Sequence, residues 1–202
     1  MSNNIKRNFS DILAFLISTV FSPYVTALVF IIIITYNSSE HLNQFLPWMI
    51  TFLFFSIIIP GIYVLWQMEI GKIHDLHISN QRERKTPFLI TGISSAIGLI
   101  ILILLHAAHP VIVVATVYLA NAIIIALITQ YWKISVHVAL FSSVVTIAVI
   151  LYGVIFGWFY LILIPLAWSR IRRQHHSILQ TIAGAVVSFA LTSAVFLAFG
   201  YL

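Results

Sequence analysis

The stretch VHVALFSSVVTIAVILYGVIFGWFYLILIPLAW, residues 136–168, decides how often this chain crosses a membrane. It contains no Asp, Glu, Lys or Arg, and as one helix it would be about 50 Å long. The hydrocarbon core of a bilayer is only about 30 Å thick, so a span needs about 20 residues. Gly153 and Gly157 offer a break. The stretch is therefore predicted to form two short spans.

The rest of the chain repeats this pattern of long apolar runs separated by short polar segments. Thr86 and Pro87 predict an N-cap followed by proline at the first helical position, which would open a span reaching about Leu105. The other predicted spans are Leu13–Tyr36, Leu46–Gln67, one that follows the turn at His106–Pro110 and ends at Thr129, and Ser177–Leu202.

The composition requires lipid as the surroundings of these helices. Hydrophobic residues make up 61% of the 202 residues and charged residues only 7%, whereas a soluble domain carries about 25% charged residues. Too few charged side chains are present to cover so much apolar surface in water. We expect an all-α, polytopic transmembrane helical bundle of six or seven spans that forms a single integral membrane domain over residues 1–202.

The positive charges predict the orientation of this bundle. With seven spans, all ten Lys and Arg residues fall on the side of the N-terminus: Lys6, Arg7, Lys72, Arg82, Arg84, Lys85, Lys133, Arg170, Arg172 and Arg173. The positive-inside rule places that side in the cytoplasm, so a multi-pass protein of the cell membrane is expected. Because these charges lie at the ends of apolar runs and not in one patch, nucleic acid is not an expected partner.

The residues that could take part in a reaction lie in three basic loops, residues 81–87, 133–137 and 169–176. The forked guanidinium of arginine matches phosphate oxygens well. A neutral imidazole can attack phosphorus, and a protonated one can donate to a leaving oxygen. The loops therefore predict phosphoryl transfer without a metal or other cofactor. His106 and His109 are spaced like a weak metal pair, but they lie on the opposite side, where a turn explains them better.

The spacing of residues in these loops is similar to three motifs of a known family. Ser169-Arg170 is followed after five residues by His176, and after three more by Gln180. Ser135-Val136-His137 keeps the Ser and His of a second motif, whereas the first motif is represented by the cations before Pro87. Over residues 72–184 the chain resembles the type 2 phosphatidic acid phosphatase (PAP2) superfamily.

This resemblance implies a role for each residue. His176 would be the nucleophile that forms a phosphohistidine, and His137 the general acid for the leaving group. Arg170 would hold the phosphate oxygens together with Arg84 or a neighbouring cation, and Ser135 would add a hydrogen bond. The neighbouring cations that remain open are Arg82, Lys85 and Lys133. The implied activity is a phosphatase acting on a phosphatidate-like or polyprenyl lipid phosphate or diphosphate, with that lipid as the partner.

Gln180 stands where the family has an aspartate that orients the nucleophilic histidine and stabilises its charge. The Gln180 amide oxygen still accepts a hydrogen bond but carries no full charge. Ser177 and Gln180 also form the sequence pattern of a helix capping box, and the two roles are compatible. Asp75 and Glu83 are the nearest acidic residues that could substitute for the aspartate.

Two other functions remain open. A weak or inactive protein on the same scaffold would bind a lipid phosphate without turning it over. A prenyltransferase would hold diphosphate through Mg²⁺ on two Asp-rich motifs, but this chain has only two aspartates, Asp11 and Asp75.

Overall fold

The chain folds as an all-α bundle. The computed structural model describes residues 8–76, 78 and 80–202, and within these ranges the regular structure is entirely helical. In chain order the elements are α1 (Phe9–Val20), α2 (Pro23–Asn37), α3 (Leu42–Leu53), the π-helix η1 (Phe54–Ile58), α4 (Ile59–Glu69), the 3₁₀ turn η2 (Gln81–Glu83), α5 (Lys85–Leu104), α6 (His109–Tyr131), α7 (Val136–Tyr152), the 3₁₀ helix η3 (Val154–Ile162), α8 (Leu163–Arg172) and α9 (Ile178–Ala198).

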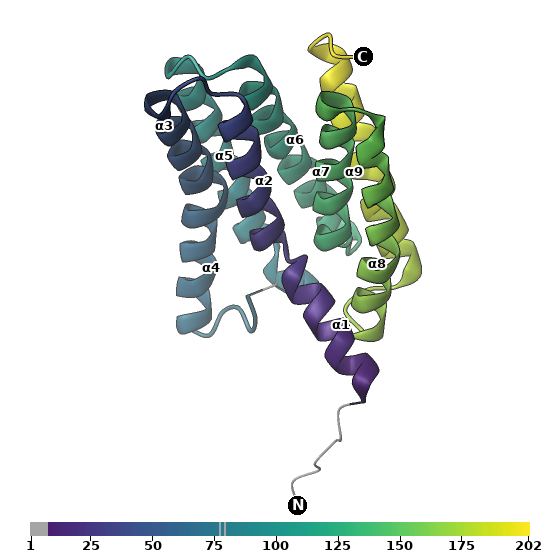
Figure 1. Cartoon of the computed structure of the whole chain (residues 1–202). Helices are drawn as coiled ribbons and strands as arrows, with labels where there is room; N and C mark the ends of the chain where they lie inside the picture. Colours follow the sequence, from purple (N-terminus) through teal and green to yellow (C-terminus); the bar gives the residue numbers. More distant parts are fainter. Residues whose placement is uncertain (1–7, 77, 79) are drawn as a thin grey trace, which may run out of the picture.

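Six helical segments of the described chain are long and apolar enough to cross a membrane, and α7 is a shorter apolar helix. The six are Phe9–Asn37, Leu42–Glu69, Gln81–Leu104, His109–Tyr131, Val154–Arg172 and Ile178–Ala198. With α7, they run alternately in opposite directions through the bundle (Figure 1). The predicted all-α polytopic membrane bundle is confirmed.

The break predicted within residues 136–168 occurs at one of the two glycines. Gly153 ends α7 with a φ of +109°, a conformation that L side chains rarely adopt. Gly157 lies inside η3 and does not interrupt it. The start of α5 differs from its prediction, because its N-cap is Arg84 and not Thr86. The turn η2 leads directly into α5, and Pro87 fits the first helical turn because N–H groups there have no intrahelical acceptor.

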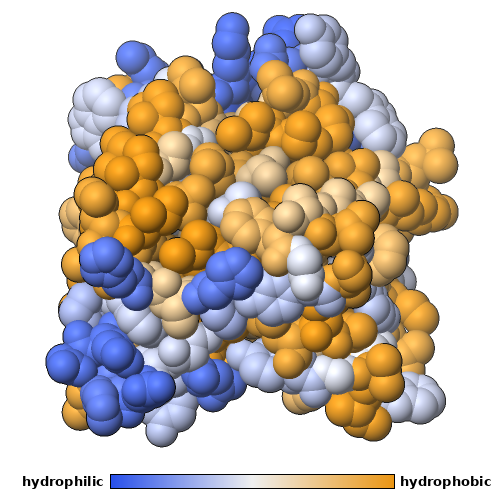
Figure 2. Space-filling view, turned by 90° about the horizontal axis from the view of Figure 1, so that it is seen from above, coloured by the Kyte–Doolittle hydropathy of each residue, from blue (hydrophilic) through white to orange (hydrophobic). Residues whose placement is uncertain are grey.

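The basic residues gather at one end of the bundle. The connections α4–α5, α6–α7 and α8–α9 lie at the same end of the bundle as the start of α1, while the C-terminus lies at the far end (Figure 1). Lys6 and Arg7 lie outside the described residues. Seen from above, the molecule has a largely hydrophobic surface with separate hydrophilic patches (Figure 2).

A π-helix and a proline make the second span irregular. Pro60 has no N–H to donate to the helix, and the carbonyl of Ser56, four residues earlier, instead accepts a hydrogen bond of 2.8 Å from the Tyr118 hydroxyl of α6. The Ser94 hydroxyl of α5 donates similarly to the carbonyl of Phe55. The irregular turn is thereby fastened to α5 and α6.

Helices α7 and α9 approach closely at the end that carries the basic loops. A Cβ on Gly184 would lie 2.7 Å from the carbonyl oxygen of Ser135, closer than real Cβ atoms come. The Ser135 N–H donates to the carbonyl of Gln180 over 3.2 Å. The glycine therefore allows the start of α9 to lie directly against the start of α7, as the small-residue spacing of α9 suggests.

Candidate active site

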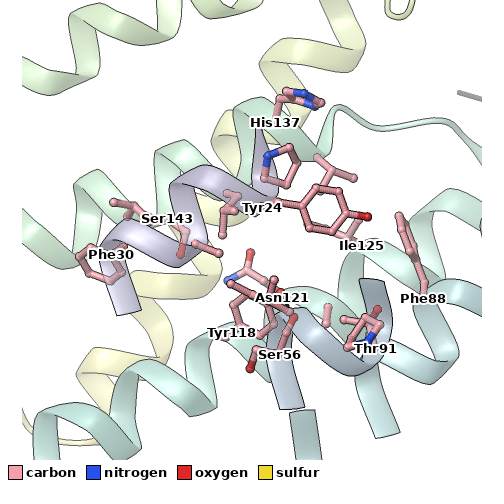
Figure 3. Close-up of a pocket in the computed structure, with 18 of the residues that line it drawn as sticks. Tyr24, Phe30, Ser56, Phe88, Thr91, Tyr118, Asn121, Ile125, His137 and Ser143 are labelled. Carbon is pink, nitrogen blue, oxygen red and sulfur yellow. Dashed lines mark hydrogen bonds between the residues drawn. The ribbon is translucent and has the colours of Figure 1, made fainter. Parts of the chain in front are cut away.

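A cavity of about 160 Å³ lies inside the bundle and reaches the end that carries the basic loops. Arg84, His137, Arg170 and His176 line it. Most of its other lining is apolar and comes from α2, η1, α4, α5, α6 and α7. Figure 3 shows Tyr24, Asn121 and His137 around this space, on α2, α6 and α7 respectively. The cavity thus combines a cationic end with an apolar body.

Arg170 lies in the last turn of α8 and is only 2% exposed. Its Nη1 donates to the hydroxyl of Ser18 in α1 over 2.5 Å, whereas its buried Nε has no acceptor among the described residues. Within the same residues, no acidic side chain lies at ion-pair distance from Arg170. The charge of Asp75 acts on Arg170 only from beyond ion-pair distance, so the guanidinium is buried without a paired carboxylate, and a bound anion would relieve part of the cost of that burial.

Arg84 is held at the same cavity by two backbone carbonyls. Its Nε donates to Ile78 over 2.7 Å and its Nη1 to Ile134 over 3.1 Å, and the side chain is buried. These bonds join the α4–α5 and α6–α7 connections. They also fix the orientation of the guanidinium, so that an anion in the cavity would meet a preorganised donor.

His176 precedes α9 and is 7% exposed. Its Nδ1 lies 3.2 Å from the Gln180 Oε1, and since an amide oxygen only accepts, this contact assigns the proton to Nδ1 and leaves a lone pair on Nε2. Burial, followed by the positive charges of Arg84, Arg170 and Lys133, lowers the pKa of His176 to about 3. The imidazole is therefore neutral near pH 7, as a nucleophile requires.

Gln180 makes both of the contacts predicted for it. The capping box is present: the Ser177 hydroxyl accepts from the Gln180 N–H over 3.3 Å, and the Gln180 Oε1 accepts from the Ser177 N–H over 3.1 Å. The same oxygen faces His176. One amide oxygen thus caps the helix and orients the histidine ring.

The α6–α7 connection supplies the other predicted residues. His137 is buried in the first turn of α7 and lines the cavity. Ser135 is buried, and its hydroxyl has no hydrogen-bond partner in the described part of the chain. Lys133 is half-buried and does not line the cavity, and its pKa is lowered by burial and then by the charges of Arg84 and Arg170.

Two predicted phosphate contacts, Arg82 and Lys85, lie elsewhere. Both are exposed, and neither lines the cavity. Arg82 belongs to the η2 turn and Lys85 begins α5, so of the cations in this loop it is Arg84 that faces inward. The first basic loop therefore contributes one arginine to the cavity.

The two acidic residues considered as replacements for the family aspartate differ in their surroundings. Glu83 accepts from Asn80 and pairs with His74 at 2.7 Å, so it organises its own loop. Asp75 is half-buried, and its charge partly opposes the lowering of the pKa of Lys133. Asp75 therefore lies near the cationic end of the cavity, whereas Glu83 stabilises the conformation of the α4–α5 connection.

At the opposite end of the bundle, His109 stacks on Tyr201, and its Nδ1 lies 2.9 Å from the tyrosine hydroxyl. Among the described residues, no group of three or more His, Cys, Asp or Glu side chains is placed to hold a metal ion. The two histidines near this turn, His106 and His109, stay apart from the cavity.

Several polar residues of the site could not be found from motif spacing. Ser18 holds Arg170, and Tyr24, Tyr118 and Asn121 line the cavity. Asn121 donates to the carbonyl of Val117 over 3.0 Å, while its buried Oδ1 has no partner within the described ranges. Their only signal in the sequence is polarity within apolar spans.

Comparison with known proteins gives no relative. The chain matches no protein-family model, no curated protein and no solved structure. Function therefore has to be inferred from the site itself.

Proposed function

We propose that this membrane protein is a phosphatase of lipid phosphates that works through a phosphohistidine at His176. The observation that carries the proposal is the shared cavity: a neutral, buried His176 and two buried arginines, Arg84 and Arg170, line one space with an apolar body. An anion with a hydrocarbon chain matches both parts of that space. A phosphatidate-like or polyprenyl phosphate or diphosphate has this chemistry, and the resemblance to the PAP2 superfamily agrees with it.

The first half-reaction forms the covalent intermediate. Arg84 and Arg170 hold the phosphate oxygens, and the lone pair on the His176 Nε2 forms a bond to phosphorus. The bond between phosphorus and the leaving oxygen breaks, and its electron pair stays on that oxygen. Protonated His137 donates its proton to that oxygen as the general acid.

The second half-reaction returns the enzyme to its starting state. Neutral His137 takes a proton from water, whose oxygen attacks the phosphorus of phosphohistidine. The N–P bond breaks, its electron pair returns to the His176 Nε2, and inorganic phosphate leaves. Gln180 accepts from Nδ1–H throughout, which keeps Nε2 directed at phosphorus.

A second candidate, a protein that binds a lipid phosphate without hydrolysing it, is favoured by one observation. Gln180 offers His176 an amide oxygen and no negative charge, so the positive charge that develops on the attacking ring is less stabilised. Such a protein would use the same cavity and the same arginines.

The membrane setting of the proposal has two parts. Six apolar helices indicate a protein of the lipid bilayer. We further propose that this is the cell membrane and that the basic loops face the cytoplasm, in accord with the positive-inside rule. The lipid would then present its phosphate from the cytoplasmic leaflet.

Phosphate release from a lipid phosphate in the presence of EDTA tests the activity. Purified wild type should release phosphate, and His176→Ala should abolish the release. His41→Ala is the matched control, because His41 is exposed and does not line the cavity. Binding of the lipid phosphate without release would support the second candidate. Strict dependence on Mg²⁺ would instead favour a prenyltransferase-like use of the two aspartates.

A further inference from the structure

A second hollow, of about 310 Å³, lies beside the cavity and is open on the outside of the bundle. It is formed by residues of α2, η1, α4 and the α4–α5 connection: Tyr24, Ile57, Ile58, Gly61, Ile62, Leu65 and Leu76. Ile58, Ile62 and Leu65 are exposed apolar side chains of a membrane-spanning segment. The hollow therefore faces the hydrocarbon core of the bilayer.

Three residues, Tyr24, Ile57 and Leu76, line both this hollow and the inner cavity. The two spaces are thus separated by a single layer of side chains, which we name the side wall. The Tyr24 hydroxyl donates across this wall to the carbonyl of Leu76, and at 3.3 Å this hydrogen bond is long. Ile57 belongs to the π-helix, a type of irregularity that is frequent at functional sites.

Charge and polarity specify what would occupy the two spaces. The cavity has its cations at one end, and from there an apolar path leads to the side wall and the outer hollow. A hydrocarbon chain neither gains nor loses much when it moves between lipid and an apolar protein surface. A phosphate group cannot follow that path, because a charge in hydrocarbon is costly.

We infer that the side wall is the passage of a lipid chain: the phosphate sits at Arg84, Arg170 and His176 while the hydrocarbon chain leaves the cavity between α2 and α4 into the bilayer. That this lipid is a phosphate-bearing substrate of the protein rests on the proposed function. The chain displaces the ring of Tyr24 from Leu76, and the tail beyond the wall stays in the membrane. Long-chain lipids therefore need this passage, and phosphate esters short enough to fit in the cavity do not.

Gly61 allows the passage to be closed from outside. A Cβ on Gly61 would meet no atom within 4 Å, so Gly61→Ala leaves the fold intact. Gly61→Trp places a large side chain in the outer hollow and leaves the cationic end of the cavity unchanged. In nanodiscs, Gly61→Trp should lower phosphate release from a dioleoyl phosphatidate about tenfold or more. The same variant should keep release from a water-soluble short-chain phosphate within about twofold of wild type. Gly61→Ala should change the release from neither substrate. Equal loss with both substrates, or no loss with either, would overturn the passage.

Photo-crosslinking tests the passage without requiring turnover. A lipid phosphate with a diazirine in its chain should label wild type at α2 and α4, near residues 57–65, more than the corresponding lipid alcohol does. Gly61→Trp should remove this excess. If the lipid phosphate labels the protein with the same distribution as the lipid alcohol, the passage is refuted, even in a protein that releases phosphate. Excess labelling by the lipid phosphate without phosphate release would refute only the catalytic proposal.

Discussion

The buried, neutral His176 predicts a specific loss of stability in acid. Its pKa is about 3 in the folded protein and about 6.5 in an unfolded chain. Between these values the unfolded state binds more protons than the folded state, so the free energy of unfolding rises with pH from about 3 to about 6.5 and is constant above. From pH 7 to pH 5, this one group removes about 2 kcal/mol from that free energy.

Thermal unfolding of the purified protein in phosphate-free buffer measures this loss. For a chain of this length, about 2 kcal/mol corresponds to a fall in melting temperature of about 4 to 8 °C. The comparison is with His176→Gln, which keeps a polar side chain beside Gln180 but has no group that titrates. All other titrating groups, His175 included, are common to both proteins. Wild type should lose this much more than the variant between pH 7 and pH 5, and an equal loss would refute the reasoning.

Three further predictions concern the packing and charges around the cavity. Arg170→Lys keeps the charge but loses the guanidinium fork, so phosphate release should fall about a hundredfold while the melting temperature changes little; an unchanged rate would contradict phosphate binding by this side chain. Gly184→Ala should cost about 1–3 kcal/mol of stability, measured by thermal unfolding, because its Cβ would meet a backbone oxygen at 2.7 Å. Gly92→Ala is its control, since the nearest atom would lie at an ordinary 3.8 Å, and equal melting temperatures would refute the close approach. Arg82→Gln and Lys85→Gln should leave phosphate release within about twofold, because both side chains are exposed away from the cavity; a tenfold loss in either would return that residue to the site.

Two features set by local sequence were predicted correctly, whereas the predicted N-cap at Thr86 was wrong by two residues. The break at Gly153 follows from the length of a span and from the backbone freedom of glycine. The capping box of Ser177 and Gln180 follows from hydrogen bonds within one helical turn. Both depend on residues close together in the chain, and neither requires knowledge of the tertiary packing.

Features that depend on packing between distant segments were predicted less well. The sequence does not distinguish the three cations of the first basic loop, Arg82, Arg84 and Lys85. Only the direction in which η2 enters α5 decides that Arg84 faces the cavity. Tyr24 joins the site through its place on α2, far from any motif. The position of an inward-facing polar residue on a uniformly apolar helix has no periodic signal in the sequence.

The central claim, that His176 attacks phosphorus, is tested most directly by trapping the covalent intermediate. Purified protein is mixed with a lipid phosphate, quenched rapidly in alkali and digested, and the phosphorylated peptide is identified by mass spectrometry. A phosphoryl group on His176, present in wild type and in His41→Ala, is the expected result. Phosphate release that proceeds with no modification of His176, or with the phosphoryl group on another residue, would contradict the claim.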